Sequence, residues 1–261
     1  MRRIYLHKAS VHINTHRPKA IMPLQHLPLT ESDLAPWNSV KETAFATSLH
    51  TVMWPQGISP STRTYLQNKM NRQLQNPNIR FFKVIDTDIP ASSTSSDAES
   101  EYVDHSNIVG ISKWEIHPNA RSEKDLKSAD AAAERAGYPP GMAEPFAQQF
   151  FGSMRRQKRS NLGGRAYINL HILAVLPEHR RRGVGEMLLR WGVEEGERRG
   201  LGIYLESSPM GKGLYERCGF RVLEWLDFDA REFRGAEPLW HACMLREVGG
   251  EDQERVDGEG S

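Results

Sequence analysis

The sequence predicts one α/β domain in which helices flank a central sheet, and three observations lead to that expectation. Short apolar runs at 79–85 and 108–116 have the length and the β-branched and aromatic content of strands. A third apolar strand, over 170–176, runs through a basic turn into a helix with one apolar face. The chain of 261 residues is also long enough to bury a proper core.

The first half of the chain carries clear start and stop signals. The expected elements are a strand over 24–29, helices over 34–51 and 60–76, and strands over 79–85 and 108–116. Thr30 is placed to cap the first helix, and Asp33 stands three residues on. Pro55 and Gly57 separate the two helices. The Ser-rich stretch within 86–107 is too polar to build a core, so we expect a mobile loop there.

The second half alternates helices with strands. Residues 119–164 are expected to hold helices over 124–136 and 144–156. Phe146, Phe150 and Met154 share one face of the second of these, which either packs on the domain or lines a pocket. Beyond 170–176 we expect a helix over 183–200, a strand over 203–205, a helix over 214–218 and a strand over 220–225.

Composition limits the partners and the compartment. A formal net charge of +1 provides no global field toward nucleic acid or membranes, so neither is expected as a partner. Cys218 and Cys243 form neither a C-x-x-C pair nor a dense framework, which favours a reducing compartment. No apolar run approaches the roughly 18 residues that a membrane span needs. We therefore expect a cytoplasmic protein without a metal site.

The two ends of the chain differ in charge. Residues 1–21 are basic and lack acidic side chains, which is compatible with a disordered extension, an upstream start or a mitochondrial address. Met22 is an alternative start for a domain over 22–248. Residues 249–261 are acidic and Gly-rich, so we expect them to be disordered.

The turn after 170–176 has the features of a phosphate site. Its glycines let backbone N–H groups approach a ligand, and the following helix N-terminus carries unpaired donors and partial positive charge. A Walker loop is excluded because Gly213 follows Gly211-Lys212, and a dinucleotide fingerprint is excluded because Leu188 occupies its third glycine position. What remains is Arg180-x-x-Gly183-x-Gly185 after a strand, with a plain solvated turn as the alternative.

This pattern resembles the pyrophosphate-binding motif of the GNAT superfamily of acyl-CoA N-acyltransferases, here of the fungal small-molecule type. The sequence Leu-Tyr-Glu-Arg-Cys-Gly-Phe at 214–220 resembles the second family motif, in which a helix carries a tyrosine just before a Gly-Phe step. The resemblance implies the GNAT fold: a mixed, mostly antiparallel sheet with splayed strands 4 and 5 and flanking helices. Family members join strands 3 and 4 by a short hairpin, so 119–164 is a helical insertion that would shape an acceptor pocket.

The resemblance also implies the reaction, which is direct transfer of an acetyl group from acetyl-CoA to a primary amine. It assigns the binding of acetyl-CoA to Leu173, Ala174, Val175, Arg180, Arg181, Arg182, Gly183, Val184, Gly185 and Glu186. The strand end would hold the pantetheine arm and the thioester carbonyl, and the turn would hold the phosphates. Tyr215 matches the tyrosine that protonates the leaving thiolate.

The base that deprotonates the amine has two candidates. His171 resembles in position one of two histidines on the same strand of arylalkylamine N-acetyltransferases, and on a regular strand it shares the face of Leu173. Asn169 occupies the other position and cannot act as a base. Glu206, at the end of the next strand, is the second candidate. For both candidates a structural role is the alternative.

Three functions are compatible with this sequence. The first is acetylation of a small-molecule amine, and the second is acetylation of a protein lysine or N-terminus. The third is a non-catalytic CoA-binding module, which the presence of Tyr215 and the intact glycine motif disfavours. The lack of a reader domain, zinc site or basic peptide-binding patch favours the small-molecule reading. The acceptor, the acyl-chain preference and the oligomeric state are left open.

Overall fold

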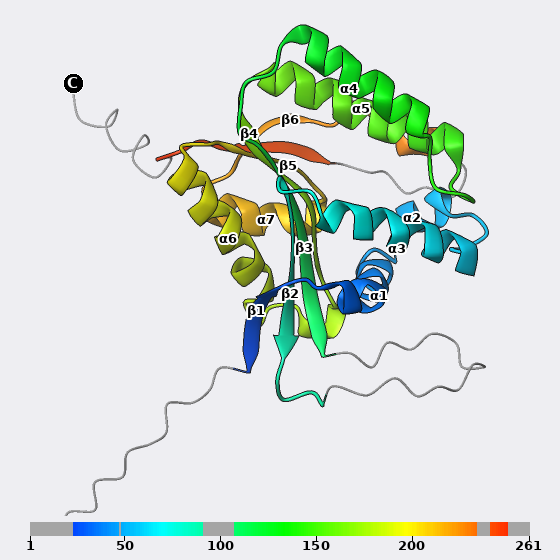
Figure 1. Ribbon diagram of the computed structural model, residues 1–261, viewed down its shortest axis with the longest axis vertical. Helices are drawn as coiled ribbons and strands as arrows, with labels where there is room; N and C mark the ends of the chain where they lie inside the picture. The colour runs from blue at the N-terminus through cyan, green and yellow to red at the C-terminus, as the bar shows by residue number, and fades with distance from the viewer. Residues whose placement is uncertain (1–22, 47, 91–106, 234–240, 250–261) are drawn as a thin grey trace, which may run out of the picture.

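The structure is a computed structural model that describes residues 23–46, 48–90, 107–233 and 241–249. The strands are β1 (Leu24–Pro28), β2 (Ile79–Asp86), β3 (Ile108–His117), β4 (Tyr167–Val175), β5 (Ile203–Ser207), β6 (Arg221–Trp225) and β7 (Ala242–Arg246). The helices are α1 (Leu34–Ala44), α2 (Ser48–Met53), α3 (Pro60–Leu74), α4 (Glu123–Ala136), α5 (Glu144–Leu162), α6 (Val184–Arg199) and α7 (Pro209–Arg217). Short 3₁₀ turns are η1 (Glu31–Asp33), η2 (Pro177–His179) and η3 (Ala230–Glu232). The strands form one seven-stranded sheet in the order β1-β2-β3-β4-β5-β7-β6 (Figure 1).

This sheet is mostly antiparallel, and it opens between its two parallel strands. Among the described strands, β4 and β5 form the parallel pair and all the other neighbours are antiparallel. β4 pairs with β5 only over 168–170, whereas its pairing with β3 continues to Val175. The carboxyl half of β4 therefore presents backbone groups toward β5 without ladder partners on that side. The expected sheet with splayed fourth and fifth strands is confirmed.

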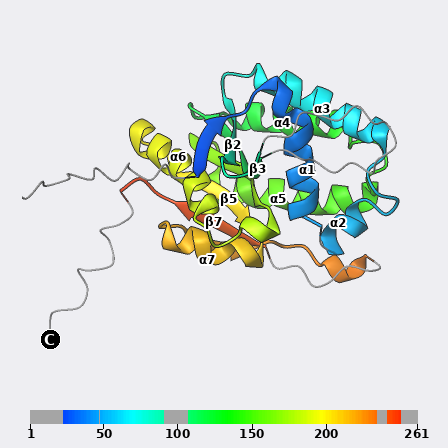
Figure 2. The same cartoon turned by 90° about the horizontal axis from the view of Figure 1, so that it is seen from below.

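Different helices cover the two faces of the sheet. α6 packs on one face through buried residues that include Val184 and Leu188, against Trp114 of β3. The opposite face is covered by α1 and α3 over β2 and β3, and by α5 over β5 and β7. In Figure 1, α6 lies on one side of the strands and α1 to α3 lie on the other, and Figure 2 shows this division from below. We call the two sides the α6 face and the α5 face.

The insertion forms the two expected helices, α4 and α5. α4 starts at a capping box in which Ser122 and Asp125 satisfy each other's backbone N–H groups. On α5, Phe146 and Phe150 are buried in a cluster with Tyr204 of β5, and Met154 borders the same cluster. The Phe146 ring packs edge-on against Phe233, with centroids 5.0 Å apart. The apolar face of α5 therefore packs on the domain, and one end of it also lines a pocket.

Several element boundaries differ from the expectations. The helix expected over 34–51 ends at Ala44 and resumes as α2, and the helix expected over 214–218 already begins at Pro209, which starts a helix well because its φ is preset. β7 was not expected, because its five buried residues carry no period-2 pattern. The expectations for 1–21, for 250–261 and for most of the 86–107 loop lie outside the described residues.

Candidate active site

The middle of β4 contains a bulge at His171. Lys113 of β3 pairs with Ile172, and Trp114 pairs with Leu170, so His171 is an extra residue without a partner. Leu170 and Leu173 both contact the α6-face cluster although they are three residues apart. The expectation that His171 shares the face of Leu173 is therefore wrong, because the bulge shifts the alternation of side chains by one residue.

The imidazole of His171 points instead to Glu115, which lies on the α5 face. Its Nε2 atom is 2.7 Å from a Glu115 carboxylate oxygen. Burial lowers the pKa of His171 to about 4, although Glu115 opposes the shift. The hydrogen bond from His171 helps to lower the pKa of Glu115 to about 2, against the opposing effect of burial. At neutral pH this histidine is uncharged and is a weak proton acceptor.

The turn after β4 forms a cradle of backbone N–H groups. Gly183 has φ 83° and Arg181 has φ 60°, so two left-handed residues shape the turn. α6 follows directly, and no side chain caps its first N–H groups. Among the described residues, the side chains of Arg180 and Arg181 have no ion-pair partner. The N-terminus of α6 therefore offers free donors and two free cations, as a diphosphate requires.

The strand end and the glycine motif meet at Gly185. A side chain at this position would contact Leu214 of α7 at 3.0 Å and Leu173 of β4 at 3.7 Å. Gly185 is thus needed for close packing of α6 against α7 and β4. Ala174 is buried against α1 and Val175 borders the α6 face, so both hold the end of β4 beside the cradle. Glu186 lies exposed in the first turn of α6, where only its backbone N–H suits a phosphate.

Arg182 has a different role from its two neighbours. Its guanidinium forms an ion pair with the buried carboxylate of Asp86 at 2.7 Å. The pKa of Asp86 is lowered because Arg182 and the backbone N–H of Asp88 stabilise its charged form more than burial penalises it. This contact joins the turn to the end of β2. Arg182 therefore stabilises the cradle as a brace between the turn and β2, and it is not a free cation.

Replacing Arg182 with Leu is expected to destabilise the fold by about 1–3 kcal/mol, because a buried carboxylate would lose its charged partner. The measurement is urea unfolding of wild type and variant from about pH 2 to pH 8, a range that extends below the unfolded pKa of an aspartate, about 3.9. Since the pKa of Asp86 is lowered in the folded state, the stabilisation is present above its unfolded pKa and is lost as the pH falls. The difference in unfolding free energy between wild type and variant should therefore become smaller at acidic pH. A difference that does not change with pH would contradict the ion-pair explanation.

Tyr215 lies on α7, next to the cradle. It is buried and packs against Phe220 with ring centroids 5.7 Å apart. Burial raises its pKa, so the phenol is protonated at neutral pH. Its neighbour Leu214 contacts the Gly185 position, which places the start of α6 and the tyrosine helix side by side. Among the described residues its hydroxyl has no hydrogen-bond partner, so it is free to donate to a ligand.

Glu206 lies on the α5 face, at the point where β4 and β5 part. Leu205 forms the last pair of β5 with β4, and Glu206 is the next residue. The Glu206 side chain is 4% exposed, and Lys158 Nζ of α5 is 3.7 Å from its Oε1 atom. Burial raises the pKa of Glu206, although Lys158 opposes the shift. Sequence reasoning missed Lys158, since nothing local shows that the insertion helix contacts the end of β5.

Several buried polar atoms on β4, on β5 and just before β7 have no hydrogen-bond partner. They are both amide atoms of Asn169, the Tyr204 hydroxyl, Glu206 Oε1 and His241 Nδ1. Asn169 is opposite Tyr204 in the β4–β5 ladder. Buried polar groups are nearly always paired, so such a group of unpaired atoms marks a place for a polar ligand or ordered water.

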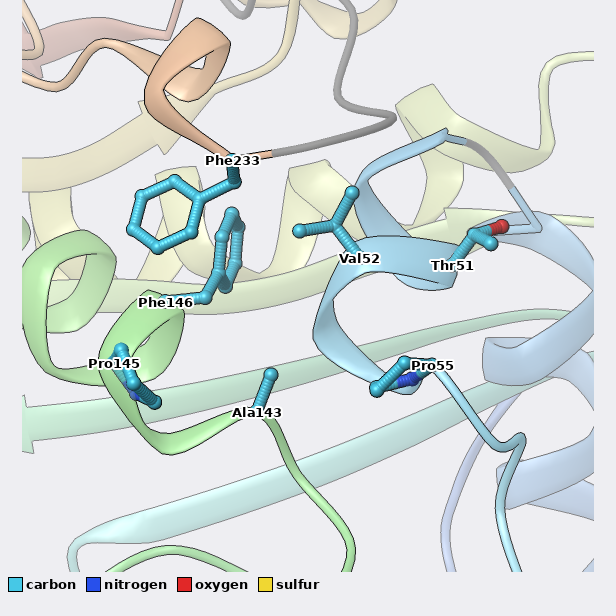
Figure 3. A pocket seen from close by; sticks show the side chains of 7 residues that line it. All are labelled: Thr51, Val52, Pro55, Ala143, Pro145, Phe146 and Phe233. Carbon is cyan, nitrogen blue, oxygen red and sulfur yellow. The ribbon is translucent and has the colours of Figure 1, made fainter.

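A cavity of about 350 Å³ opens on the same side of the molecule. It is lined by Thr51, Val52, Pro55, Ala143, Pro145, Phe146 and Phe233. Figure 3 shows Phe146 and Phe233 facing Val52 across this space. The backbone N–H of Ala143 donates to Met53 O at 2.9 Å and ties α2 to the start of α5. The walls are mostly apolar and come from α2, the insertion and the segment after η3.

Two further features are absent from the described residues. Over the described ranges, no group of three or more His, Cys, Asp or Glu side chains is arranged to hold a metal ion. No helix in the part of the chain that the structure describes is long and apolar enough to cross a membrane.

Comparisons with known proteins give a family match over part of the chain. Residues 147–222 match the family described as Acetyltransferase (GNAT) domain. A protein of Ajellomyces capsulatus described as "Probable acyltransferase SID5" is 39% identical over 44 residues, which are 17% of this chain and 32% of that protein. The match thus spans about a third of the length of this curated relative.

Solved structures show the same fold over nearly the whole domain. A histone acetyltransferase HPA2 and related acetyltransferase from Corynebacterium glutamicum has a TM-score of 0.51 and 22% identity, covering 87% of this chain and 97% of its own. A mosquito arylalkylamine N-acetyltransferase like 5b has a TM-score of 0.56 and 14% identity, with coverages of 86% and 100%. An agmatine N-acetyltransferase has a TM-score of 0.54 and 11% identity, with coverages of 87% and 100%. The family match over residues 147–222 supports a GNAT superfamily acyltransferase, and the solved structures share its fold.

Proposed function

We propose that this protein is an N-acetyltransferase that transfers the acetyl group of acetyl-CoA directly to the primary amine of a small molecule. The observation that carries the proposal is the meeting of three features. The unpaired end of β4, the uncapped start of α6 at Gly183 and the buried phenol of Tyr215 adjoin one another. They supply groups for a thioester arm, a diphosphate and a leaving sulfur, which are the parts of an acyl-CoA.

The residues fit acetyl-CoA in the following way. Backbone groups of Leu173, Ala174 and Val175 bind the pantetheine arm, and one of their N–H groups polarises the thioester carbonyl. The N–H groups of Gly183, Val184, Gly185 and Glu186 bind the diphosphate, with Arg180 and Arg181 adding charge. Tyr215 donates a hydrogen bond and then a proton to the departing sulfur. Arg182 contributes through its brace to Asp86.

The proposed acceptor enters from the α5 face. The β4–β5 ladder ends between the α6 face, where the cradle lies, and the face with His171 and the apolar cavity, so the two substrates would meet at the splay. The cavity is concave and mostly apolar, which suits an apolar or aromatic part of a small molecule. His171 is neutral and accepts a hydrogen bond from the amine, while Glu115 orients its ring. No role for nucleic acid, a membrane or a metal is part of the proposal.

The proposal includes the cytoplasm as the compartment. Both cysteines of the chain, Cys218 and Cys243, are free, as in a reducing environment.

Thermal unfolding with and without acetyl-CoA tests the proposal first. Ligand at about 100 times its dissociation constant is expected to add roughly 2.7 kcal/mol of stability. The double variant Arg180→Ala/Arg181→Ala should weaken this stabilisation while leaving the melting temperature without ligand nearly unchanged. No stabilisation by acetyl-CoA or by a longer acyl-CoA would overturn the proposal.

An acceptor screen then distinguishes the possible reactions. Release of CoA is followed with phenethylamine, agmatine, spermidine, a lysine-containing peptide and a peptide with a free alanine N-terminus. Turnover with the small amines supports the proposal, and turnover with peptides alone identifies a protein acetyltransferase. Binding of acetyl-CoA without transfer to any acceptor would identify a CoA-binding module.

A further inference from the structure

We propose that Glu206 binds the ammonium group of the acceptor on the α5 face and takes its proton before attack on the thioester. This inference rests on the proposed acetyl transfer and names the catalytic base for it. It also gives the insertion a chemical role, because the insertion helix α5 supplies Lys158, the cation that faces this carboxylate.

The position of Glu206 is the first reason. It is the first residue of β5 beyond the ladder with β4, so it stands where the two strands begin to separate. Its neighbour Leu205 contacts the α6-face cluster, whereas Tyr204 belongs to the α5-face cluster. Because side chains alternate along a strand, Glu206 projects to the same face as Tyr204, where the apolar cavity also lies.

The unpaired atoms are the second reason. Glu206 Oε1 and Asn169 Oδ1 are buried acceptors without hydrogen-bond partners, and they come from the two strands that flank the splay. An ammonium group carries three donors and a positive charge, so its chemistry suits such acceptors. The contact with Lys158 is loose, at 3.7 Å, and leaves that oxygen available to a second cation.

The ionisable groups around this point favour Glu206 over His171 as the base. Burial raises the pKa of Glu206 above the usual carboxyl value, and burial lowers the pKa of His171 to about 4. A raised pKa makes a carboxylate a stronger proton acceptor, whereas a lowered pKa makes an imidazole a weaker one, so the glutamate is the better base of the two. The groups that interact with Glu206 or Lys158 from the packed elements are Tyr204, Cys243, Tyr167, His117 and His171.

The proposed reaction balances as follows. Glu206 takes one proton from the ammonium, and the nitrogen lone pair forms the C–N bond to the thioester carbon. The C–S bond breaks with its electron pair going to sulfur, which takes a proton from Tyr215. The nitrogen loses its second proton as the amide forms, and that proton restores the phenol. Glu206 finally releases its proton to solvent, so ammonium and acetyl-CoA yield amide, CoA thiol and one proton.

The test compares Glu206→Gln with a matched control, Glu224→Gln. Glu224 lies on β6 and hydrogen-bonds Asn161 of α5 at 2.7 Å, so it also joins a strand to the insertion helix. With the best amine of the acceptor screen, Glu206→Gln is expected to lower kcat/KM by about 100-fold or more. Thermal stabilisation by acetyl-CoA should be unchanged in both variants, and the control should keep its turnover.

A second variant, Lys158→Met, tests the pair through its pH profile. Loss of the cation raises the pKa of Glu206 further, so the acidic limb of kcat/KM should move to higher pH by about one unit. A base must be ionised to act, so the variant should lose most activity at low pH and recover as the pH rises. A purely structural ion pair would lower the melting temperature without moving this limb.

The outcomes separate this inference from the proposed function. The role of Glu206 is overturned, and the proposed function is kept, by the following result. The wild type is active, Glu206→Gln keeps kcat/KM within about threefold, and the acidic limb of the pH profile does not move in Lys158→Met. If Glu206→Gln does not fold, the position of the acidic limb of kcat/KM in Lys158→Met decides whether Glu206 acts as the base. A wild type that fails to bind acetyl-CoA, or that binds it and transfers to no amine, overturns the proposed function and the role of Glu206 with it.

Discussion

Replacing Tyr215 with Phe is expected to lower kcat by about 10²- to 10⁴-fold, the usual contribution of a positioned acid. The ring packs edge-on against Phe220, and Phe preserves that packing. Burial raises the pKa of the phenol, so its proton is present at neutral pH and is available to the leaving sulfur. Without the hydroxyl, the thiolate must leave with no donor from α7.

The measurement is steady-state turnover with acetyl-CoA and the best amine, together with thermal unfolding. Stabilisation by acetyl-CoA should be retained, because the cradle at α6 does not depend on the hydroxyl. Tyr65→Phe on α3 is the matched control, since it removes a phenol from a helix on the opposite face. A Tyr215→Phe variant that turns over like wild type would remove the tyrosine from the mechanism.

Replacing Gly192 with Leu is expected to have the largest effect on stability. Gly192 lies on α6, where an added Cβ would stand 2.1 Å from the ring of Trp114 on β3. The Trp114 side chain is fully buried and donates to Ser112 Oγ at 3.1 Å, so the ring has nowhere to move. Overpacking of this kind costs about 3 kcal/mol or more, a large part of the 5–15 kcal/mol that typically holds a domain together.

Urea unfolding of Gly192→Leu beside Gly213→Ala gives the measurement and its control. Gly213 lies on α7, where an added Cβ would meet only the end of Arg217, at 3.7 Å. That substitution should be neutral or stabilising by about 0.4–1 kcal/mol, because it restricts the unfolded chain. Equal stability of the Gly192→Leu variant and wild type would contradict the close approach of α6 to the sheet.

The glycine motif was predictable because it is local. Arg180-x-x-Gly183-x-Gly185 places its donors within a single turn, so spacing alone indicates an anion site there. The structure shows that the three arginines of this turn differ. Arg180 and Arg181 have no ion-pair partner among the described residues, whereas Arg182 forms an ion pair with Asp86 of β2. Spacing could not distinguish these arginines, since Asp86 is far away along the chain.

The choice of base could not be predicted because it depends on strand register and on distant partners. One extra residue at the bulge turns His171 away from the face of Leu173 and toward Glu115. Burial by the insertion helix and the nearby Lys158 decide the environment of Glu206, and neither is visible within the local sequence.

By itself the sequence predicted the strands and helices around the glycine turn and two motifs that resemble the GNAT superfamily, and that resemblance implied the splayed mixed sheet. The elements and the motifs follow from short-range patterns, in which neighbouring residues along the chain define a periodicity or a spacing. The tertiary structure alone decided which arginine is a brace, where His171 points and which carboxylate lies buried where β4 and β5 separate. Those properties depend on pairs such as Lys158 and Glu206, which only the packing of α5 on the sheet brings together.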